Sequence, residues 1–158
     1  MSEQDVLEEV ERLRLLVSQF AAPAQLTAEQ RAGSVCAWCG GEPGPATADL
    51  HVIGMTPRGC SECYWARLNW LTTWYDWRDH IADCEYCLGG SMCFVSHGRR
   101  TAHEETITDA GQPELSCGAC TGSILPTEMA VPRLWEGDSA PYLGYVHLRC
   151  AIKRRAVR

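Results

Sequence analysis

The sequence predicts a small α+β protein in which metal-binding cysteines hold short modules together around two helices. Three observations predict this class. The chain has 158 residues and ten cysteines, most of them in Cys-x-x-Cys pairs. Two stretches, residues 3–20 and 62–82, have the apolar periodicity of helices. The segments between them are rich in glycine and proline, which leaves room for short strands only.

The first element is an N-terminal amphipathic helix over residues 3–20. Its apolar residues recur at alternating spacings of four and three: Val6, Val10, Leu13, Val17 and Phe20. This is a heptad seam of about two heptads, which is too short for a stable isolated coiled coil. The seam packs either against the protein's own body or against a partner helix, so a homodimer through this helix is one expectation.

Less regular segments follow. Residues 21–34 are expected to form a linker with a short helix after Thr27, and residues 40–59 to form loops with short strands. The second long helix spans 62–82. Residues 98–113 are polar and predict a connector. Strands around 129–135 and 142–146, and a helix from about 147, complete the chain.

The setting of the cysteines favours metal over disulfides. The N-terminal stretch MSEQDVLEEVERLR is acidic and lacks the basic and apolar regions of a secretory signal. We therefore expect a cytoplasmic location, where thiols stay reduced. Close cysteine pairs in a reducing compartment are typical of metal sites. No apolar run approaches the roughly 18 residues that suggest a membrane span, so no membrane contact is expected.

The first predicted metal site consists of Cys36, Cys39, Cys60 and Cys63. Tetrahedral zinc takes four thiolate or imidazole ligands, and two cysteines separated by two residues can hold one edge of the tetrahedron. The first pair, in CAWCGG, ends in glycines that allow the backbone to turn under a metal. The second pair opens the long helix, whose N-terminus favours the negative thiolates.

The third predicted site consists of Cys117, Cys120, His147 and Cys150. It combines a CGAC turn with a C-terminal HLRC segment, and the strands between them predict a hairpin. The last two ligands are expected in the first turn of the final helix. Both outer sites resemble treble-clef zinc fingers, and the third resembles the fingers of LIM-type modules. The resemblance implies structural zinc.

The middle predicted site contains Cys84, Cys87 and Cys93 and needs a fourth ligand. His80 precedes Cys84 by four residues and shares its helix face if the helix persists that far, so His80 is favoured. The alternative is His97, which completes a tail similar to that of CCCH fingers. With His80 and His147, the ten cysteines make three complete ligand sets, which predicts three zinc ions and leaves no cysteine over.

The middle segment also resembles two protein families. His-x3-Cys-x2-Cys is similar to the motif of zinc-binding anti-sigma factors, over about eight residues. Cys-x2-Cys-x5-Cys resembles the WhiB-like iron–sulfur proteins, although their Gly/Trp turn motif is absent. Zinc is therefore the expected metal here, and an iron–sulfur cluster is the alternative.

Residues 36–69 resemble HNH nucleases of the phage recombination-endonuclease type. The parts of the motif are Cys36, Cys39, Asp49, His51, Gly54, Arg58, Gly59, Cys60 and Cys63. The resemblance implies a histidine base that activates water beside a divalent ion. However, Leu50 separates Asp49 from His51, and Tyr64 stands where the family has an asparagine. We therefore expect the frame of these nucleases without catalytic residues.

The central helix carries a stripe of tryptophans. Trp70, Trp74, Trp77 and Ile81 lie on one face, and Leu68, Leu71 and Tyr75 widen it. A buried core is the favoured interpretation, because small metal-bound modules have few other large apolar side chains. The alternatives are a groove for a partner helix and a stacking platform for single-stranded nucleic acid.

Charge bears on the choice of partner. The formal net charge is −6, and thiolates bound to metal would make the chain more acidic. Such a chain is expected to repel a phosphate backbone, which favours a protein partner. The exception is a basic C-terminal group, through which nucleic acid could bind: Arg149, Lys153, Arg154, Arg155 and Arg158.

Together these patterns predict four regions. They are an N-terminal helix and linker (1–31), a zinc module with two metal sites and the Trp-rich helix (32–98), a connector (99–113) and a C-terminal treble-clef-like finger (114–158). The predicted function is that of a non-enzymatic zinc-binding regulator or adaptor, with transcription as the expected setting. A nucleic-acid-binding regulator and an HNH-type nuclease are the alternatives.

Overall fold

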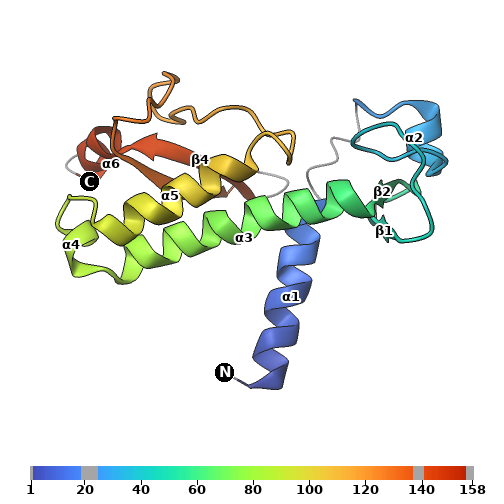
Figure 1. The fold of residues 1–158 in the computed structure, drawn as a ribbon, viewed down its shortest axis with the longest axis horizontal. Helices are drawn as coiled ribbons and strands as arrows, with labels where there is room; N and C mark the ends of the chain where they lie inside the picture. Colours follow the sequence, from blue (N-terminus) through green and yellow to red (C-terminus); the bar gives the residue numbers. More distant parts are fainter. Residues whose placement is uncertain (1, 19–24, 137–140, 156–158) are drawn as a thin grey trace. The chain divides into compact units, whose positions relative to one another are not determined.

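The computed structural model describes residues 2–18, 25–136 and 141–155 (Figure 1). Its helices and two antiparallel two-stranded sheets confirm the α+β class. The chain divides into two compact units: unit 1 is Met1–Thr72 with Asp109–Gly111, and unit 2 is Thr73–Thr108 with Gln112–Arg158. The four predicted regions stay a prediction. None of the helices described is long and apolar enough to cross a membrane.

Unit 1 begins with α1 (Glu3–Ser18), which confirms the predicted N-terminal helix. Leu16 and Val17 near its end are buried, whereas Leu7 and Val10 are more than half exposed. Among the seam side chains that the structure describes, Val17 is therefore covered and Val10 is not. Phe20, the last predicted seam residue, lies outside the described residues, and pairing with a partner helix stays a prediction.

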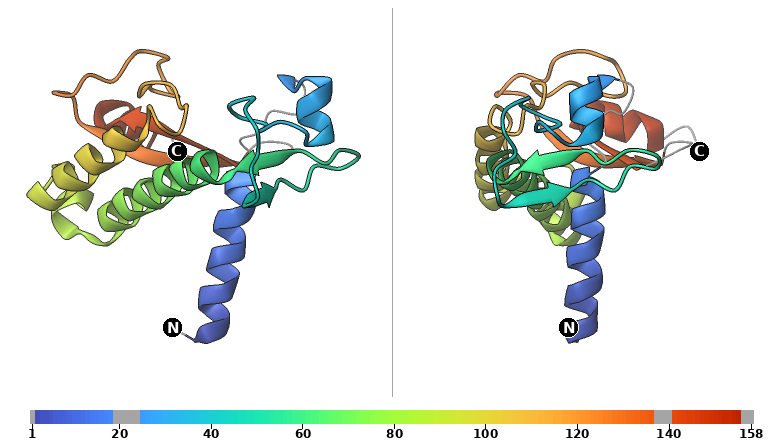
Figure 2. Two further views of the ribbon diagram at one scale, coloured as in Figure 1. Left: turned by 45° about the vertical axis from the view of Figure 1, so that its right-hand side comes forward. Right: turned by 90° about the vertical axis from the view of Figure 1, so that its right-hand side faces the viewer.

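The predicted short helix is α2 (Ala28–Ala32), and Thr27 caps it. The Thr27 hydroxyl accepts a hydrogen bond from the Gln30 backbone N–H at 3.2 Å, and the Gln30 side chain accepts from the Thr27 N–H at 2.8 Å. This reciprocal capping box satisfies two N–H groups that the helix itself leaves unpaired. Strands β1 (Thr47–Asp49) and β2 (Arg58–Cys60) then pair as a hairpin that leads into α3 (Figure 2).

Helix α3 (Ser61–Asp83) confirms the second long helix and contributes residues to both units. In unit 2, the short α4 (Glu85–Leu88) is followed by α5 (Phe94–Thr106), which runs back alongside α3 (Figure 1). Strands β3 (Ala130–Glu136) and β4 (Pro141–His147) pair along their full length. Helix α6 (Leu148–Arg155) ends the described chain. Both predicted strands and the terminal helix are confirmed.

Helix α5 covers residues 98–106, most of the segment in which the sequence predicted only a polar connector and no helix. The buried face of this helix is polar: Ser96, Arg100, His103 and Thr106. Each has a partner; the two ring nitrogens of His103, for example, face the hydroxyls of Thr73 and Tyr145. Because α5 buries hydrogen-bonded polar groups, it has no apolar stripe. The apolar periodicity of the sequence therefore did not reveal this helix.

The tryptophan stripe of α3 is core, as the favoured interpretation predicted. Trp70, Trp74 and Trp77 are all buried. In unit 2, Trp77 lies between α5 and β4: its indole N–H donates to the Ser96 hydroxyl at 3.2 Å, and its ring stacks on Tyr145 with centroids 6.2 Å apart. A tryptophan that fills space and also satisfies its N–H is costly to replace.

We expect Trp77→Ala to lower the free energy of unfolding of unit 2 by about 3–5 kcal/mol, because it leaves a large cavity and an unpaired Ser96 hydroxyl. Trp65 is on the same helix but 64% exposed. Trp65→Ala is the control and should change the free energy by less than about 0.5 kcal/mol. Urea unfolding of the metal-loaded protein measures both, and equal effects of the two changes would contradict the assignment of Trp77 to the core.

Candidate metal sites

The twelve residues predicted to bind metal come together in three groups of four. These are Cys36, Cys39, Cys60 and Cys63 (first site); His80, Cys84, Cys87 and Cys93 (middle site); and Cys117, Cys120, His147 and Cys150 (third site). Within each group the sulfur and ring-nitrogen atoms lie within 4.8 Å of one another. Each group is therefore able to hold a metal ion.

The first site is built by a turn, a hairpin and a helix of unit 1. Cys36 and Cys39 lie in a turn closed by a hydrogen bond from Gly40 N–H to the Cys36 carbonyl at 2.9 Å. Cys60 is the last residue of β2, and Cys63 lies in the first turn of α3. The Cys39 and Cys60 sulfurs are 3.9 Å apart, close to the sulfur–sulfur separation expected around one tetrahedral zinc.

Backbone N–H groups prepare Cys36 to act as a thiolate. Its sulfur accepts from the Cys60 N–H at 3.3 Å and the Trp38 N–H at 3.5 Å. Burial opposes ionisation of this thiol, but the backbone hydrogen bonds outweigh burial and lower its pKa to about 7. At Cys63, burial and the neighbouring cysteines raise the pKa instead. Four close thiols do not all ionise without a cation between them, which fits a site built for a metal ion.

Sequence reasoning missed Arg67, which belongs to the surroundings of the first site. It follows Cys63 by four residues on α3, and its guanidinium lies 4.7 Å from the centroid of the Trp38 ring. Its side chain also donates to the Ala110 carbonyl. Burial lowers the pKa of Arg67, and the negative charges of Cys63 and Cys36 oppose that shift by favouring the charged guanidinium. A cation near Cys63 and Cys36 offsets part of the negative charge of the site, and its spacing from Cys63 was the signal available in the sequence.

The middle site is built where α3 ends and α5 begins, in unit 2. The Cys84 N–H donates to the His80 carbonyl at 2.9 Å, so the helical turn continues one residue past Asp83. His80 Nε2 lies 3.0 Å from the Cys93 sulfur and 3.9 Å from the Cys87 sulfur. His80 is therefore the histidine that faces the three thiols, as favoured.

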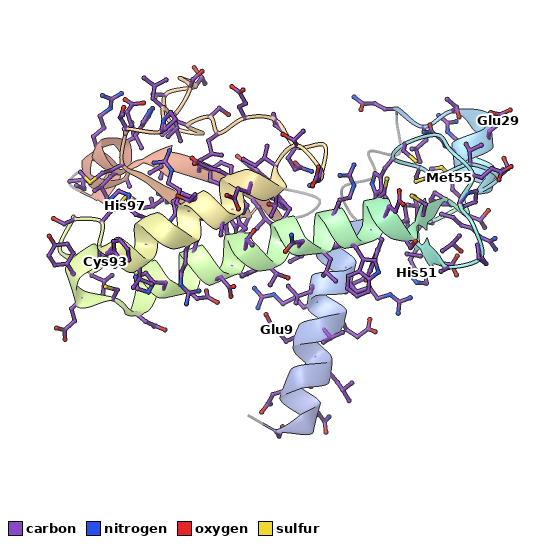
Figure 3. All side chains as sticks on the ribbon, in the orientation of Figure 1. Glu9, Glu29, His51, Met55, Cys93 and His97 are labelled. Atoms are coloured by element: carbon purple, nitrogen blue, oxygen red, sulfur yellow. The ribbon has the colours of Figure 1, made fainter. Side chains whose placement is uncertain are left out.

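Cys93 caps α5 through its sulfur, which accepts from the Ser96 N–H at 3.4 Å. This hydrogen bond is the main cause that lowers the pKa of Cys93 to about 6. His97, the alternative ligand, lies one turn further along α5 and is exposed (Figure 3). It belongs to none of the three groups. The structure therefore brings His80, and not His97, to the cysteines.

The third site repeats the order of turn, hairpin and helix. The Cys117 sulfur accepts from the His147 N–H at 3.4 Å. Burial opposes ionisation of Cys117, but this and other backbone hydrogen bonds lower its pKa to about 6. His147 closes β4 rather than lying in the final helix as expected, whereas Cys150 does lie in the first turn of α6. The strand end therefore sets the position of His147.

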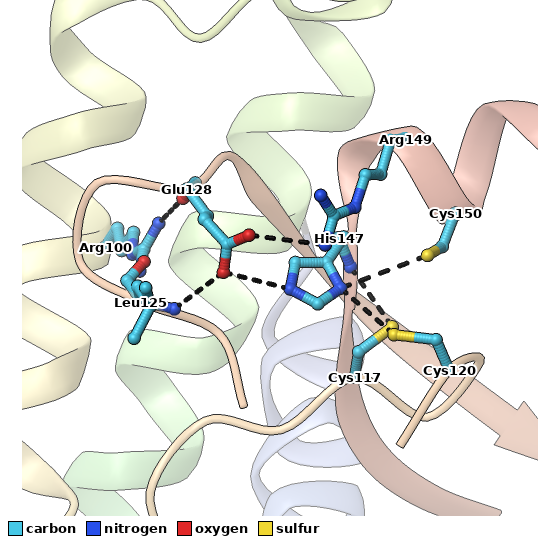
Figure 4. A network of polar contacts seen from close by, with 8 residues as sticks. All are labelled: Arg100, Cys117, Cys120, Leu125, Glu128, His147, Arg149 and Cys150. Atoms are coloured by element: carbon cyan, nitrogen blue, oxygen red, sulfur yellow. Dashed lines mark hydrogen bonds and ion pairs between the residues drawn. The ribbon is translucent and has the colours of Figure 1, made fainter. Parts of the chain in front are cut away.

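The two nitrogens of the buried His147 have different neighbours (Figure 4). Nδ1 lies 3.4 Å from the Cys120 sulfur and 3.9 Å from the Cys150 sulfur. Nε2 lies 3.2 Å from a carboxylate oxygen of Glu128. Hydrogen bonding by the Leu125 N–H lowers the pKa of Glu128, so the carboxylate is ionised at neutral pH and only accepts hydrogen bonds. Nε2 is therefore the nitrogen that donates to Glu128, and Nδ1 is the nitrogen that faces the thiols.

An aromatic ring packs on a glycine next to each outer site. Trp38, between Cys36 and Cys39, lies over Gly59, and Trp135 of β3 lies over Gly118, between Cys117 and Cys120. A Cβ on Gly59 would come within 2.2 Å of the Trp38 ring, and one on Gly118 within 2.9 Å of Trp135. A side chain at either position would collide with the ring, so only glycine allows each cysteine turn to pack this closely against its hairpin.

The residues that resemble an HNH motif do not form a metal group. Asp49 and His51 are both exposed and belong to none of the groups found among the described residues. Asp49 instead forms an ion pair with Arg58 across the hairpin, at 3.6 Å. His51 lies in the left-handed region, with φ of 48°.

The donor chemistry of the three groups fits zinc. Each offers four thiol or imidazole donors, and soft thiolates with imidazole select zinc over the hard cations calcium and magnesium. The protonated Nε2 of His147 on a carboxylate is an arrangement that zinc-bound histidines commonly have.

A comparison of the chain with known protein families, curated proteins and solved structures finds no significant match.

Proposed function

We propose that the chain is a structural zinc protein that binds three zinc ions and acts by contacting another protein. The observation that carries the proposal is the completeness of the three groups, each with four donor atoms within 4.8 Å of one another. Four protein ligands fill a tetrahedral zinc site and leave no position for water or substrate, as in structural and not catalytic zinc sites.

The order of elements supports a treble-clef-like arrangement of the outer sites. In both, a cysteine turn precedes a two-stranded hairpin, and the last ligand lies in the first turn of the following helix. In this arrangement a single zinc ion ties the turn to the helix and replaces much of the apolar core that so small a module lacks.

Native mass spectrometry of the reduced protein, combined with elemental analysis, tests the zinc assignment. We expect three zinc ions per chain and no iron. Iron with acid-labile sulfide would support a cluster at the middle site. Fewer than three metal ions at saturating zinc would contradict the ligand assignment.

The proposal of a protein partner is supported by exposed apolar side chains next to ligands of the middle site. Four are exposed, and Phe94, beside Cys93, is 91% exposed: Tyr86, Leu88, Phe94 and Val95. Such exposure is typical of residues that contact a partner. Asp83 and Glu85 beside them are also exposed, and no ion pair holds them within the described residues. The matching partner is a segment that presents an apolar side chain flanked by lysine or arginine.

Selection of random peptides on the zinc-loaded protein tests this partner chemistry. We expect enrichment of apolar residues flanked by lysine or arginine, and loss of binding in Phe94→Ser. Ile53 is exposed to a similar degree in the β1–β2 loop, so Ile53→Ser is the matched control and should still bind. Selection of peptides that bind both variants equally would overturn the assignment of this surface.

We also propose that the chain is not an enzyme and that it acts in transcription. The ion pair between Asp49 and Arg58 and the exposure of His51 support a non-enzymatic hairpin. Magnesium- or manganese-dependent nicking of DNA that is lost in His51→Ala would instead establish the nuclease alternative. DNA binding that weakens with salt and requires residues 153–158 would establish the nucleic-acid alternative.

A further inference from the structure

The middle and third sites are connected within unit 2 by a series that consists of the α5 backbone and the polar contacts of Arg100 and Glu128. The series begins at Cys93, a ligand of the middle site and the N-cap of α5. It continues through Arg100, two turns further along the same helix. It ends at Glu128, which contacts the third-site ligand His147.

Arg100 holds the turn that carries Glu128. Its guanidinium is only 4% exposed, and it donates to the Leu125 carbonyl at 3.0 Å and to the Glu128 carbonyl (Figure 4). Its Nε donates to Glu104 at 2.8 Å, so the buried charge is paired on its own helix. Movement of this buried guanidinium would leave its N–H donors without acceptors, which costs free energy, so its position is closely fixed.

Glu128 then orients the histidine. One carboxylate oxygen accepts from the Leu125 N–H at 3.0 Å and from His147 Nε2 at 3.2 Å, and the other faces Arg149 at 3.3 Å. These contacts turn Nδ1 toward the Cys120 and Cys150 sulfurs. Without the carboxylate, neither the ring orientation nor the tautomer is fixed.

Helix α5 can transmit the effect of metal binding, because its stability depends on whether the middle site holds metal. It has 13 residues and contains Gly98 and three β-branched residues, so it is marginal as an isolated helix. Its first turn is held by the Cys93 sulfur, which is fixed in place when the middle site binds metal. Metal at the middle site thus stabilises α5, and α5 holds Arg100 where it supports the third site.

From this series of contacts we propose that Arg100 and Glu128 are positioning residues that make metal binding at the middle and third sites cooperative. The proposal rests on the proposed function, since it presupposes that both sites bind zinc. Coupling is reciprocal: loss of metal from the third site weakens binding at the middle site by a factor on the order of ten, and the reverse holds equally. The first site lies outside this series.

A double-mutant cycle tests the coupling. Zinc-loaded protein is titrated with a competing chelator, and alkylation of Cys93 reports the loss of metal from the middle site. Cys150→Ser, which damages only the third site, is expected to expose Cys93 at about tenfold lower chelator concentration. In an Arg100→Gln background, Cys150→Ser should cause no further shift, because the link is already broken.

Matched controls separate coupling from general damage. Arg99 precedes Arg100 but faces Asp76 at the surface, so the shift should persist in an Arg99→Gln background. Cys63→Ser in the first site should not move the Cys93 midpoint. If Arg100→Gln exposes Cys93 without chelator, Glu128→Ala takes its place in the cycle, since it removes the contact to His147 and leaves the α5 backbone intact.

The outcomes are distinguishable. A Cys93 midpoint that is unchanged by Cys150→Ser in otherwise unaltered protein would overturn the coupling while leaving the zinc proposal intact. Cys93 that alkylates at once in zinc-loaded protein would overturn the zinc proposal itself. Nitrogen-15 NMR of the loaded protein gives a second readout: we expect zinc on His147 Nδ1 and a proton on Nε2, and in Glu128→Ala that proton should exchange faster with water because its acceptor is gone.

Discussion

A strong chelator added to the reduced protein is expected to abolish most of its helical and tertiary signal. Structural zinc sites contribute about 10–16 kcal/mol of binding free energy at neutral pH, which exceeds or equals the whole net stability of an ordinary domain. Here each outer module consists of a turn, a two-stranded hairpin and a helix end, with few buried apolar residues of its own. Without metal, the thiols of each site are also left close together with no cation between them.

Far-ultraviolet circular dichroism and tryptophan fluorescence measure this loss. Trp74 and Trp77 are fully buried, so their emission should shift to longer wavelength as water reaches them. A reductant must be present to exclude disulfides, and excess zinc should restore both signals. Full helical signal in excess chelator would mean that the apolar core alone holds the fold, and the structural role of the metal would be rejected.

The second large effect is expected at His80. His80→Ala removes the imidazole that faces the three thiols of the middle site, so this site should lose its zinc under mild chelation. The coupling proposed above adds weakened binding at the third site. His80→Cys supplies a fourth thiolate and should restore three zinc ions per chain, which separates loss of a ligand from damage to α3.

His97→Ala is the matched control, because His97 has the same side chain on the neighbouring helix but is exposed and outside the group. It should retain three zinc ions with the wild-type chelator midpoint. Native mass spectrometry counts the ions in all three variants. Loss of zinc from His97→Ala, with full occupancy in His80→Ala, would reverse the assignment of the fourth ligand.

The ligand groups and the long helices can be predicted from the sequence alone. Cys-x-x-Cys spacing follows from the geometry of a tetrahedral metal and acts over a few residues, so it is visible in the chain. The tryptophan stripe of α3 is equally visible, because a helix repeats every 3.6 residues and its core face must be apolar. The cap at Thr27 belongs to the same class of local signals.

The sequence leaves open whether His80 or His97 faces the thiols, because both lie at workable spacings and the answer depends on where α3 ends in the folded chain. The tertiary structure also revealed α5, whose buried face is polar and therefore lacks apolar periodicity. The roles of Arg67, Arg100 and Glu128 follow from contacts across as many as 43 positions of the chain. A charged residue that distant partners bury cannot be distinguished, in the sequence, from an exposed one, because its cost of burial is offset only by groups that folding brings to it.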